Sequence, residues 1–218
     1  MKPPDVQIIP IVSQMFEENA YLVYAADAEG VVVVDPGLEP LRIVSEIERI
    51  GRRPAAVLNT HGHGDHIAGN AELKRRWPDC PIVIGEHEAH KLTDPTANLS
   101  EAFGLAFTSP PADRTVADGD FFEAAGLRIG VREIPGHSAG HVVYVIDDLK
   151  PLHVLVGDVI FAGSVGRTDF FDGSFSQLAA GIRSKLFSLP DDTVLWPGHG
   201  PPTTVGEEKR SNPFVGGS

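Results

Sequence analysis

The chain has 218 residues and a formal net charge of −12 at neutral pH, and 42% of its residues are hydrophobic. This apolar content excludes a disordered chain, and the negative charge argues against a general binder of nucleic acid or anionic membranes, because phosphate groups would be repelled. Cys80 is the only cysteine, which excludes an intramolecular disulfide.

The N-terminal stretch MKPPDVQIIPIV lacks the long apolar core of a signal peptide. The longest apolar runs, such as VVVV at 31–34, have the length of strands and are too short to cross a bilayer. No short-period repeat or linker divides the chain. We therefore expect a cytoplasmic protein with one domain over residues 1–218 and no membrane partner.

The first part of the chain alternates short β-branched runs with turn residues, a pattern typical of strands. These runs predict strands at 6–12, 20–25, 31–34, 55–60 and 81–85. An apolar stripe at helical spacing between Pro40 and Gly51 predicts a helix. Further helices are expected at 70–77 and at 86–92.

Residues 94–119 are rich in Asp, Pro and Ser and are expected to form a surface excursion that shapes the mouth of a substrate site. A hairpin around Ala125-Gly126 follows. Ser174 begins a predicted helix that has Phe175 on its apolar face. Further strands are predicted at 141–146, 153–161 and 193–196. We expect an α/β fold in which two packed sheets are covered by helices.

The motif THGHGDH at 60–66 directly follows a predicted strand and precedes a helix. Residues two apart on an extended backbone point the same way, so His61 and His63 can converge on one ion. Asp65 and His66 enter the helix and can face a second ion. Three histidines and an aspartate within six residues predict a metal site more strongly than they predict surface residues.

Three further candidates are His137, Asp158 and His199. Each follows an apolar strand by one or two residues and lies beside glycine, where such folds place their functional residues. With them, the set contains enough imidazole and carboxylate donors for two ions, with Asp158 between the ions and an open position for water. Asp65 and Asp158 are also the predicted catalytic residues. The predicted metal ligands are His61, His63, Asp65, His66, His137, Asp158 and His199.

These residues resemble the metallo-β-lactamase superfamily, whose T-H-x-H-x-D-H motif matches THGHGDH. The resemblance implies an αββα sandwich of two mixed β-sheets flanked by helices, with the metals at one edge of the sheets. It assigns His61, His63 and His137 to the first metal. It assigns Asp65, His66 and His199 to the second metal, and Asp158 to both. Asp158 stands where the zinc β-lactamases have cysteine, which disfavours antibiotic hydrolysis of that type.

Within the superfamily, GDVIFAGSVGRTDF, PGHSAGH, DPTANLS and the closing NPF resemble the short glyoxalase II-like (hydroxyacylglutathione hydrolase-like) hydrolases. The resemblance implies thioester hydrolysis and makes Arg167 a substrate-binding residue. Asp169 and Pro201 stand where the family has tyrosines, and no basic C-terminal region that would bind glutathione follows His199. We therefore expect hydrolysis of thioesters or related activated acyl bonds, without a strict requirement for glutathione.

The expected nucleophile is a hydroxide that bridges two divalent ions, and one ion polarises the carbonyl oxygen. Zinc is the expected metal, although N and O donors also accept iron or manganese. The positive charge of the ions favours a small, anionic thioester as substrate. The alternative is a mononuclear iron persulfide dioxygenase, a class that shares the GRTDF stretch and uses the equivalents of His61, His137 and Asp158. A lactonase and an inactive scaffold are weaker alternatives.

The stretch GHSAG at 136–140 also fits G-x-S-x-G, the nucleophile elbow of serine hydrolases. An elbow needs a helix after the serine, whereas GHVVYVI predicts a strand, so Ser138 is not expected to be the nucleophile. His141 is expected to form a structural hydrogen bond near the site, and Cys80 is expected to be structural. The sequence leaves two roles open for Asp35, that of a turn residue and that of a partner orienting a metal-bound histidine.

Overall fold

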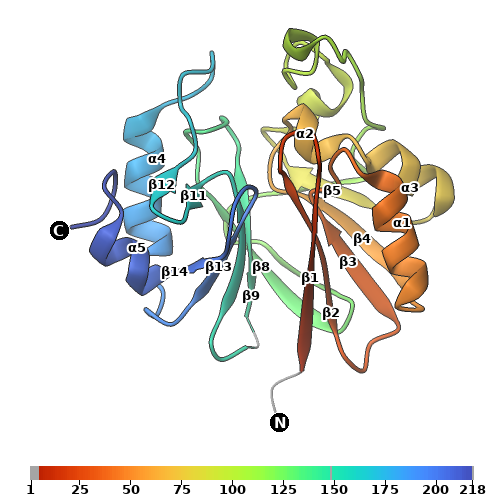
Figure 1. Ribbon diagram of the computed structural model, residues 1–218, viewed down its shortest axis with the longest axis horizontal. Helices are drawn as coiled ribbons and strands as arrows, with labels where there is room; N and C mark the ends of the chain where they lie inside the picture. The colour runs from red at the N-terminus through yellow and green to blue at the C-terminus, as the bar shows by residue number, and fades with distance from the viewer. Residues whose placement is uncertain (1–4, 148, 218) are drawn as a thin grey trace.

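The computed structural model describes residues 5–147 and 149–217. Two six-stranded sheets pack against each other, and helices cover the outer face of each sheet (Figure 1). This four-layer arrangement is the predicted αββα sandwich. No helix in the described ranges is long and apolar enough to span a membrane.

The first sheet has the strands in chain order, β1-β2-β3-β4-β5-β6. The β1–β3 pairs are antiparallel and the β3–β6 pairs are parallel. The helices α1 and α3 cover its outer face (Figure 1). The elements of this half are β1 (Val6–Val12), β2 (Asn19–Ala25), β3 (Gly30–Val34), α1 (Pro40–Arg49), β4 (Arg53–Asn59), α2 (Gly64–Ile67), α3 (Asn70–Arg76), β5 (Ile82–Gly85), the 3₁₀ helices η1 (Ala89–Thr93) and η2 (Glu101–Phe103), and β6 (Arg114–Val116).

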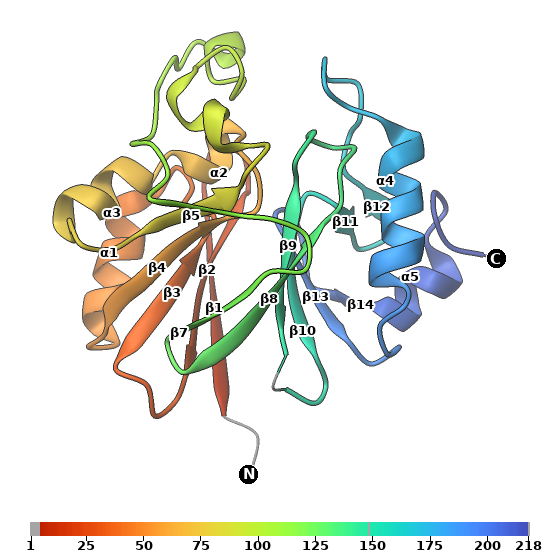
Figure 2. The ribbon, with the colours of Figure 1, turned by 180° about the vertical axis from the view of Figure 1, so that it is seen from behind.

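The second sheet has the order β14-β13-β10-β9-β8-β7, and only the β10–β13 pair is parallel. The helices α4 and α5 lie on its outer face (Figure 2). The elements of this half are β7 (Phe121–Ala124), β8 (Leu127–Glu133), β9 (Val142–Ile146), β10 (His153–Gly157), the small hairpin β11 (Ile160–Phe161) and β12 (Ser164–Val165), α4 (Phe175–Gly181) with its π-helical continuation η3 (Ile182–Leu186), β13 (Val194–Pro197), β14 (Thr203–Thr204) and α5 (Val205–Ser211).

Strand β9 shows why the sequence folds into layers. Successive side chains of a strand point to opposite faces of the sheet. Tyr144 packs into the cluster between the two sheets, together with Val32 of the first sheet. Its neighbours Val143 and Val145 pack on the other face, in the cluster that also contains Leu178 of α4. A strand that is apolar on both faces therefore needs a sheet on one side and a helix on the other.

Most of the predicted elements are present within a residue or two of the expected bounds. The hairpin at Ala125-Gly126 is confirmed, and both residues have positive φ, 51° and 74°, as a type I′ turn requires. Ser174 accepts a hydrogen bond from the Gln177 backbone N–H at the start of α4, as the capping motif predicts.

Four expectations on elements need correction. Residues 114–116, expected in the surface excursion, form β6, because Asp113 accepts a hydrogen bond from the Ile82 backbone N–H and holds this segment beside β5. The helix expected at 86–92 is the shorter 3₁₀ helix η1. The strand expected at 153–161 breaks at Gly157, whose φ of +48° ends β10. Phe175 is exposed, because α4 enters the buried cluster only from Leu178 onward.

Candidate metal centre

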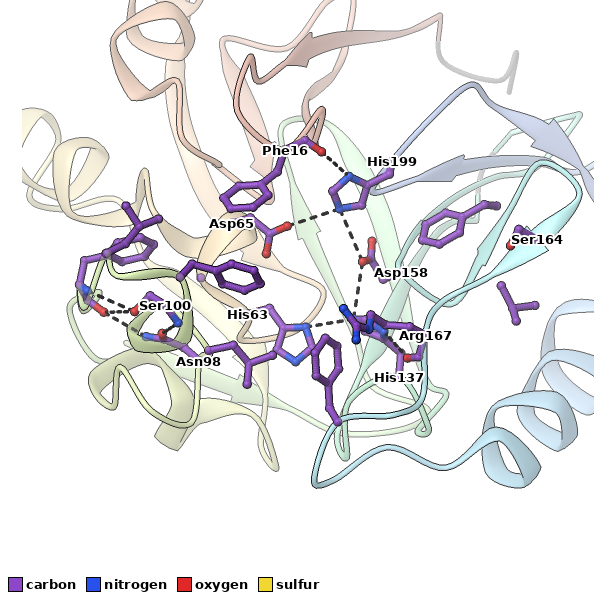
Figure 3. Close-up of a pocket in the computed structure, with 18 residues that line it drawn as sticks. Phe16, His63, Asp65, Asn98, Ser100, His137, Asp158, Ser164, Arg167 and His199 are labelled. Carbon is purple, nitrogen blue, oxygen red and sulfur yellow. Dashed lines mark hydrogen bonds and ion pairs between the residues drawn. The ribbon is translucent and has the colours of Figure 1, made fainter.

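All seven predicted ligands lie at one edge of the two sheets, where strands end. His61 and His63 follow β4, and Asp65 and His66 belong to α2. The remaining three follow strands of the second sheet, namely His137 after β8, Asp158 after β10 and His199 after β13. Figure 3 shows five of them facing one another across a pocket, namely His63, Asp65, His137, Asp158 and His199.

Three imidazoles form the first group. Nδ1 of His63 lies 3.0 Å from Nε2 of His61 and 3.0 Å from Nε2 of His137. Burial lowers the pKa of all three histidines, and nearby histidines lower the pKa of His61 and His63 further. Neutral imidazoles present lone pairs, so this group offers three nitrogen donors to one ion.

The second group consists of Asp65, His66 and His199. Oδ2 of Asp65 lies 3.4 Å from Nε2 of His199 and 3.8 Å from Nε2 of His66. Burial lowers the pKa of His66, but the carboxylates of Asp158 and Asp65 outweigh burial and raise that pKa well above its usual value. The negative charge of these carboxylates therefore attracts a cation to this position.

Asp158 connects the two groups. Its Oδ1 lies 3.5 Å from Nε2 of His66, whereas its Oδ2 lies 3.5 Å from Nε2 of His137 and 3.6 Å from Nε2 of His199. Burial raises the pKa of Asp158, but these three histidines outweigh burial and hold the pKa below the usual range. An ionised carboxylate in this position can bind two ions at once, which is the role that the sequence predicts for it.

Two buried polar atoms test whether the site fits metal ions. Nε2 of His66 and Oδ1 of Asp158 are buried and have no hydrogen-bond partner within the described protein. Such atoms are costly unless a ligand completes them. The donor atoms of the first group, of the second group and of the set His61, His66 and Asp158 each lie within 4.8 Å of one another. They are imidazole nitrogens and carboxylate oxygens, which suit zinc, iron or manganese. The residues therefore fit a binuclear metal site.

Hydrogen bonds from the ring nitrogens orient the histidines. Asp35 accepts from Nδ1 of His66 at 3.1 Å and from the backbone N–H and hydroxyl of Thr60, both at 2.7 Å. His137 donates from Nδ1 to the Arg167 carbonyl at 2.8 Å, and His199 donates to the Phe16 carbonyl at 3.0 Å. Each bond leaves Nε2 free for a metal. Of the two roles left open for Asp35, the structure therefore supports that of an orienting partner.

Sequence reasoning missed a buried ionic network behind the first group. Glu88 accepts hydrogen bonds from the backbone N–H groups of Gly62 at 2.9 Å and Gly140 at 2.8 Å. It also accepts from the hydroxyl of Ser138 at 2.7 Å. Lys91 contacts the same hydroxyl and forms an ion pair with Asp172. The i, i+3 spacing of Glu88 and Lys91 was the available signal, but this spacing is common on solvated helices.

The network also explains Ser138 and its neighbourhood. The Ser138 hydroxyl is buried and bonded to Glu88 and Lys91, and the segment that follows is strand β9, not the helix of a nucleophile elbow. His141 accepts a hydrogen bond from the Asp158 backbone N–H at 3.1 Å, which confirms its expected structural role. The candidate metal ligand of this segment is therefore His137.

Glu18 is a second feature that the sequence did not reveal. Its side chain is buried, both carboxyl oxygens have no hydrogen-bond partner in the described chain, and burial raises its pKa well above the usual value. Gly37 lies so close to this carboxyl that a side chain at position 37 would overlap it. The backbone of Glu18 forms a β-bridge with that of His199, so this acid lies beside the second group.

A cavity of about 360 Å³ opens onto the ligands. Asp65 and Asp158 line it, together with three of the histidines. Arg167, the predicted substrate-binding residue, also lines it, but forms a bidentate ion pair with Asp169 at 2.6 and 2.7 Å. The aromatic and aliphatic wall includes Phe16, Phe103, Leu105, Phe107, Phe161 and Phe170.

Comparison with known proteins also supports a metal-binding site. Residues 15–199 match the metallo-beta-lactamase superfamily, whose members are generally metal-dependent hydrolases. The hydroxyacylglutathione hydrolase GloC of Haemophilus influenzae is 34% identical, over 97% of this chain and 98% of GloC.

Solved structures agree over nearly the whole chain. The BLEG-1 B3 metallo-beta-lactamase has a TM-score of 0.89 and 33% identity, covering 98% of this chain and all of that one. A di-iron-bound form of TTHA1623 has a TM-score of 0.82 and 37% identity, covering 95% and 100%. ETHE1 from Myxococcus xanthus has a TM-score of 0.79 and 28% identity, covering 96% and 84%. This chain belongs to the metallo-β-lactamase superfamily.

Proposed function

We propose that this protein is a glyoxalase II-like hydrolase that cleaves thioesters or related activated acyl bonds. The observation that carries the proposal is the position of Asp158, whose two oxygens face the two groups of imidazoles at the wall of the cavity. The similarity to GloC over nearly the full length of both chains supports the reaction class.

Two divalent ions held by these residues would supply a water of lowered pKa and would polarise a carbonyl oxygen. The protein's own contribution is to hold the donors in place before a substrate arrives. Asp65 and Asp158 line the cavity and are the groups we propose to accept a hydrogen bond from the attacking water. The ring nitrogens that face away from the site are engaged by Asp35 and by backbone carbonyls, which fixes the donor atoms that face the substrate.

Persulfide dioxygenase activity is the second candidate. The similarity to ETHE1, a persulfide dioxygenase, favours it. The imidazole and carboxylate donors of the site also accept iron, and the neighbour TTHA1623 has been solved in a di-iron-bound form. The two candidates differ in what they consume, since a dioxygenase requires O₂ and a hydrolase requires only water. We propose zinc as the metal of the hydrolase and a small-molecule thioester as its substrate.

The experiment compares four reactions on protein reloaded separately with zinc, iron(II) and manganese(II). The assays measure thiol release from a lactoyl thioester, O₂ consumption with glutathione persulfide, opening of a chromogenic cephalosporin and opening of a lactone. The proposal expects thiol release to be fastest and to be lost in Asp158→Asn, but not in Asp27→Asn, a control at an exposed turn residue. Faster O₂ consumption with one iron per chain would establish the second candidate instead.

A further inference from the structure

We propose that the part of the substrate that fills the cavity is apolar, so that thioesters with an apolar acyl or thiol group are preferred over those of glutathione. This inference rests on the proposed hydrolase function. Glutathione carries two carboxylates, and a site built for it would offer cations to bind them. The cavity wall offers aromatic surface instead.

The first argument is the exposure of large apolar side chains at the cavity. Phe103 and Leu105 line it and remain 57% and 38% exposed. The Phe103 ring packs edge-on against Phe16 across the wall, with ring centroids 5.4 Å apart. Phe103 and Leu105 belong to the segment around η2 that rises beyond the edge of the sheets (Figure 1). An apolar ligand would remove this surface from water, which favours binding.

The second argument is that the polar side chains of the same segment are already engaged. Asn98 donates to the Phe107 carbonyl at 3.1 Å and accepts from the Ser100 backbone N–H at 2.9 Å. The Ser100 hydroxyl donates to the same carbonyl at 3.1 Å. The Gly64 backbone N–H then joins the segment to the ligand-bearing turn through the Asn98 carbonyl, at 2.7 Å. Figure 3 shows Asn98 and Ser100 bonded within their own loop.

The third argument is that the arginine in the cavity wall is already paired with a carboxylate. Among the described residues that line the cavity, Arg167 is the sole lysine or arginine. Asp169 forms a bidentate ion pair with Arg167. The Arg167 guanidinium also lies 4.5 Å from the centre of the Phe170 ring. A glutathione carboxylate would have to compete with Asp169 for Arg167, because Asp169 already neutralises the charge of the guanidinium and binds its Nε and Nη2. Asp169 therefore acts against anionic carriers, while Phe103 and Leu105 favour apolar ones.

The first arm of the test measures kcat/KM on the metal-loaded enzyme with matched thioesters. One series keeps N-acetylcysteamine as the thiol and extends the acyl group from acetyl to hexanoyl. A second series keeps the lactoyl group and changes the thiol from glutathione to N-acetylcysteamine and to hexanethiol. Each methylene buried is expected to raise kcat/KM about threefold. The preferred series should therefore rise about tenfold to a hundredfold, and the glutathione thioester should not exceed the hexanethiol thioester.

The second arm substitutes the residues that we propose to determine substrate specificity, namely Phe103, Leu105 and Asp169. Phe103→Ser combined with Leu105→Ser should remove most of the preference for the longer chain, whereas Phe121→Ser should keep it. Phe121 is a matched control, because it is 58% exposed and lines no part of this cavity. Asp169→Ala should free Arg167 and raise the activity on lactoylglutathione relative to the neutral thioesters by up to about fivefold. Asp191→Ala, which breaks the exposed ion pair with Lys209, should leave that ratio unchanged.

Equilibrium binding of an uncleavable hexyl thioether of N-acetylcysteamine, measured by calorimetry, separates this inference from the proposed function. If no thioester is hydrolysed but the thioether binds and the double serine variant binds it at least fivefold more weakly, the reaction class is wrong and the apolar specificity stands. The inference is overturned if lactoylglutathione is preferred by more than tenfold. It is also overturned if the double serine variant retains both the chain-length preference and the binding of the thioether.

Discussion

The ammonium group of Lys91 lies 2.6 Å from Oδ2 of Asp172, although the two residues are 81 positions apart and Lys91 is only 1% exposed. Lys91 lies in η1 of the first half of the chain, and Asp172 lies in the loop before α4. Asp172 also accepts from the Ala139 backbone N–H at 3.2 Å, near His137. The pair therefore joins the two halves directly behind the candidate metal site.

We expect Lys91→Met to destabilise the protein by about 3–5 kcal/mol, because it leaves the carboxylates of Glu88 and Asp172 buried without their cation. For a chain of this size, the melting temperature should fall by about 6–20 °C. Urea unfolding at neutral pH measures the loss. Lys74→Met is the matched control, since Lys74 forms a partly exposed pair with Asp113 at 2.8 Å and should cost less than about 1 kcal/mol. Equal losses in both variants would contradict the importance of the buried network.

Asp35→Asn should lower the affinity for the second metal ion about tenfold to a hundredfold, because the negative charge that orients His66 is lost. Asparagine keeps the size of the side chain and tolerates the φ of +47° at this position, so the fold should persist. Competition with a chromogenic chelator measures the affinity. The exposed variant Asp27→Asn should bind metal like the wild type, and an unchanged affinity in Asp35→Asn would assign Asp35 to the turn alone.

Purified protein reconstituted with metal should hold about two ions per chain, at a separation of about 3.5–4 Å. The reason is that the set His61, His66 and Asp158 shares His61 with the first group and His66 with the second, so the donor atoms are continuous and more numerous than one ion can use. Elemental analysis gives the count and a crystal structure of the loaded protein gives the separation. A reproducible single ion that leaves Asp65 and His66 uncoordinated would favour the dioxygenase reading.

Ser138→Ala should keep most of the activity, whereas His137→Ala and Asp158→Ala should lose metal and rate together. The Ser138 hydroxyl is buried in the network with Glu88 and Lys91, so its loss should cost about 1–3 kcal/mol of stability. Activity per folded molecule and bound metal are measured on the same samples. Covalent labelling of Ser138 by an organophosphate, with matching inactivation, would contradict this assignment.

Cys80 should react very slowly with a disulfide reagent at pH 8 in the folded protein. Burial raises the pKa of its thiol to about 11, and the thiolate is the reactive form. Because the folded-state pKa lies above the ordinary value, the folded protein retains the proton more strongly, and reactivity should rise as the pH increases from about 9 towards 11. Denatured protein serves as the reference, and a folded rate equal to the denatured rate would show that the thiol is accessible.

Much of the site could be predicted from the sequence because its signals are local. THGHGDH places four donors within six residues, and each remaining donor follows an apolar run within a few residues. The strands could be predicted equally well, because β-branched runs between turn residues favour the extended conformation locally. The failures arose where a segment depends on a distant partner, as β6 depends on β5 and as Phe175 depends on where α4 meets the sheet.

The sequence by itself therefore determined the candidate ligands, because the spacing of the donors along the chain indicates them. The resemblance of its motifs to a known family then implied the superfamily and the αββα sandwich. Only the tertiary structure decided that Asp35 orients His66, that Lys91 and Asp172 meet behind the site, and that Asp169 pairs with Arg167 in the cavity wall. Except for the pair of Arg167 and Asp169, these relationships join residues from different elements. Buried charges must find partners wherever the fold brings them, and no local pattern records which partner that will be.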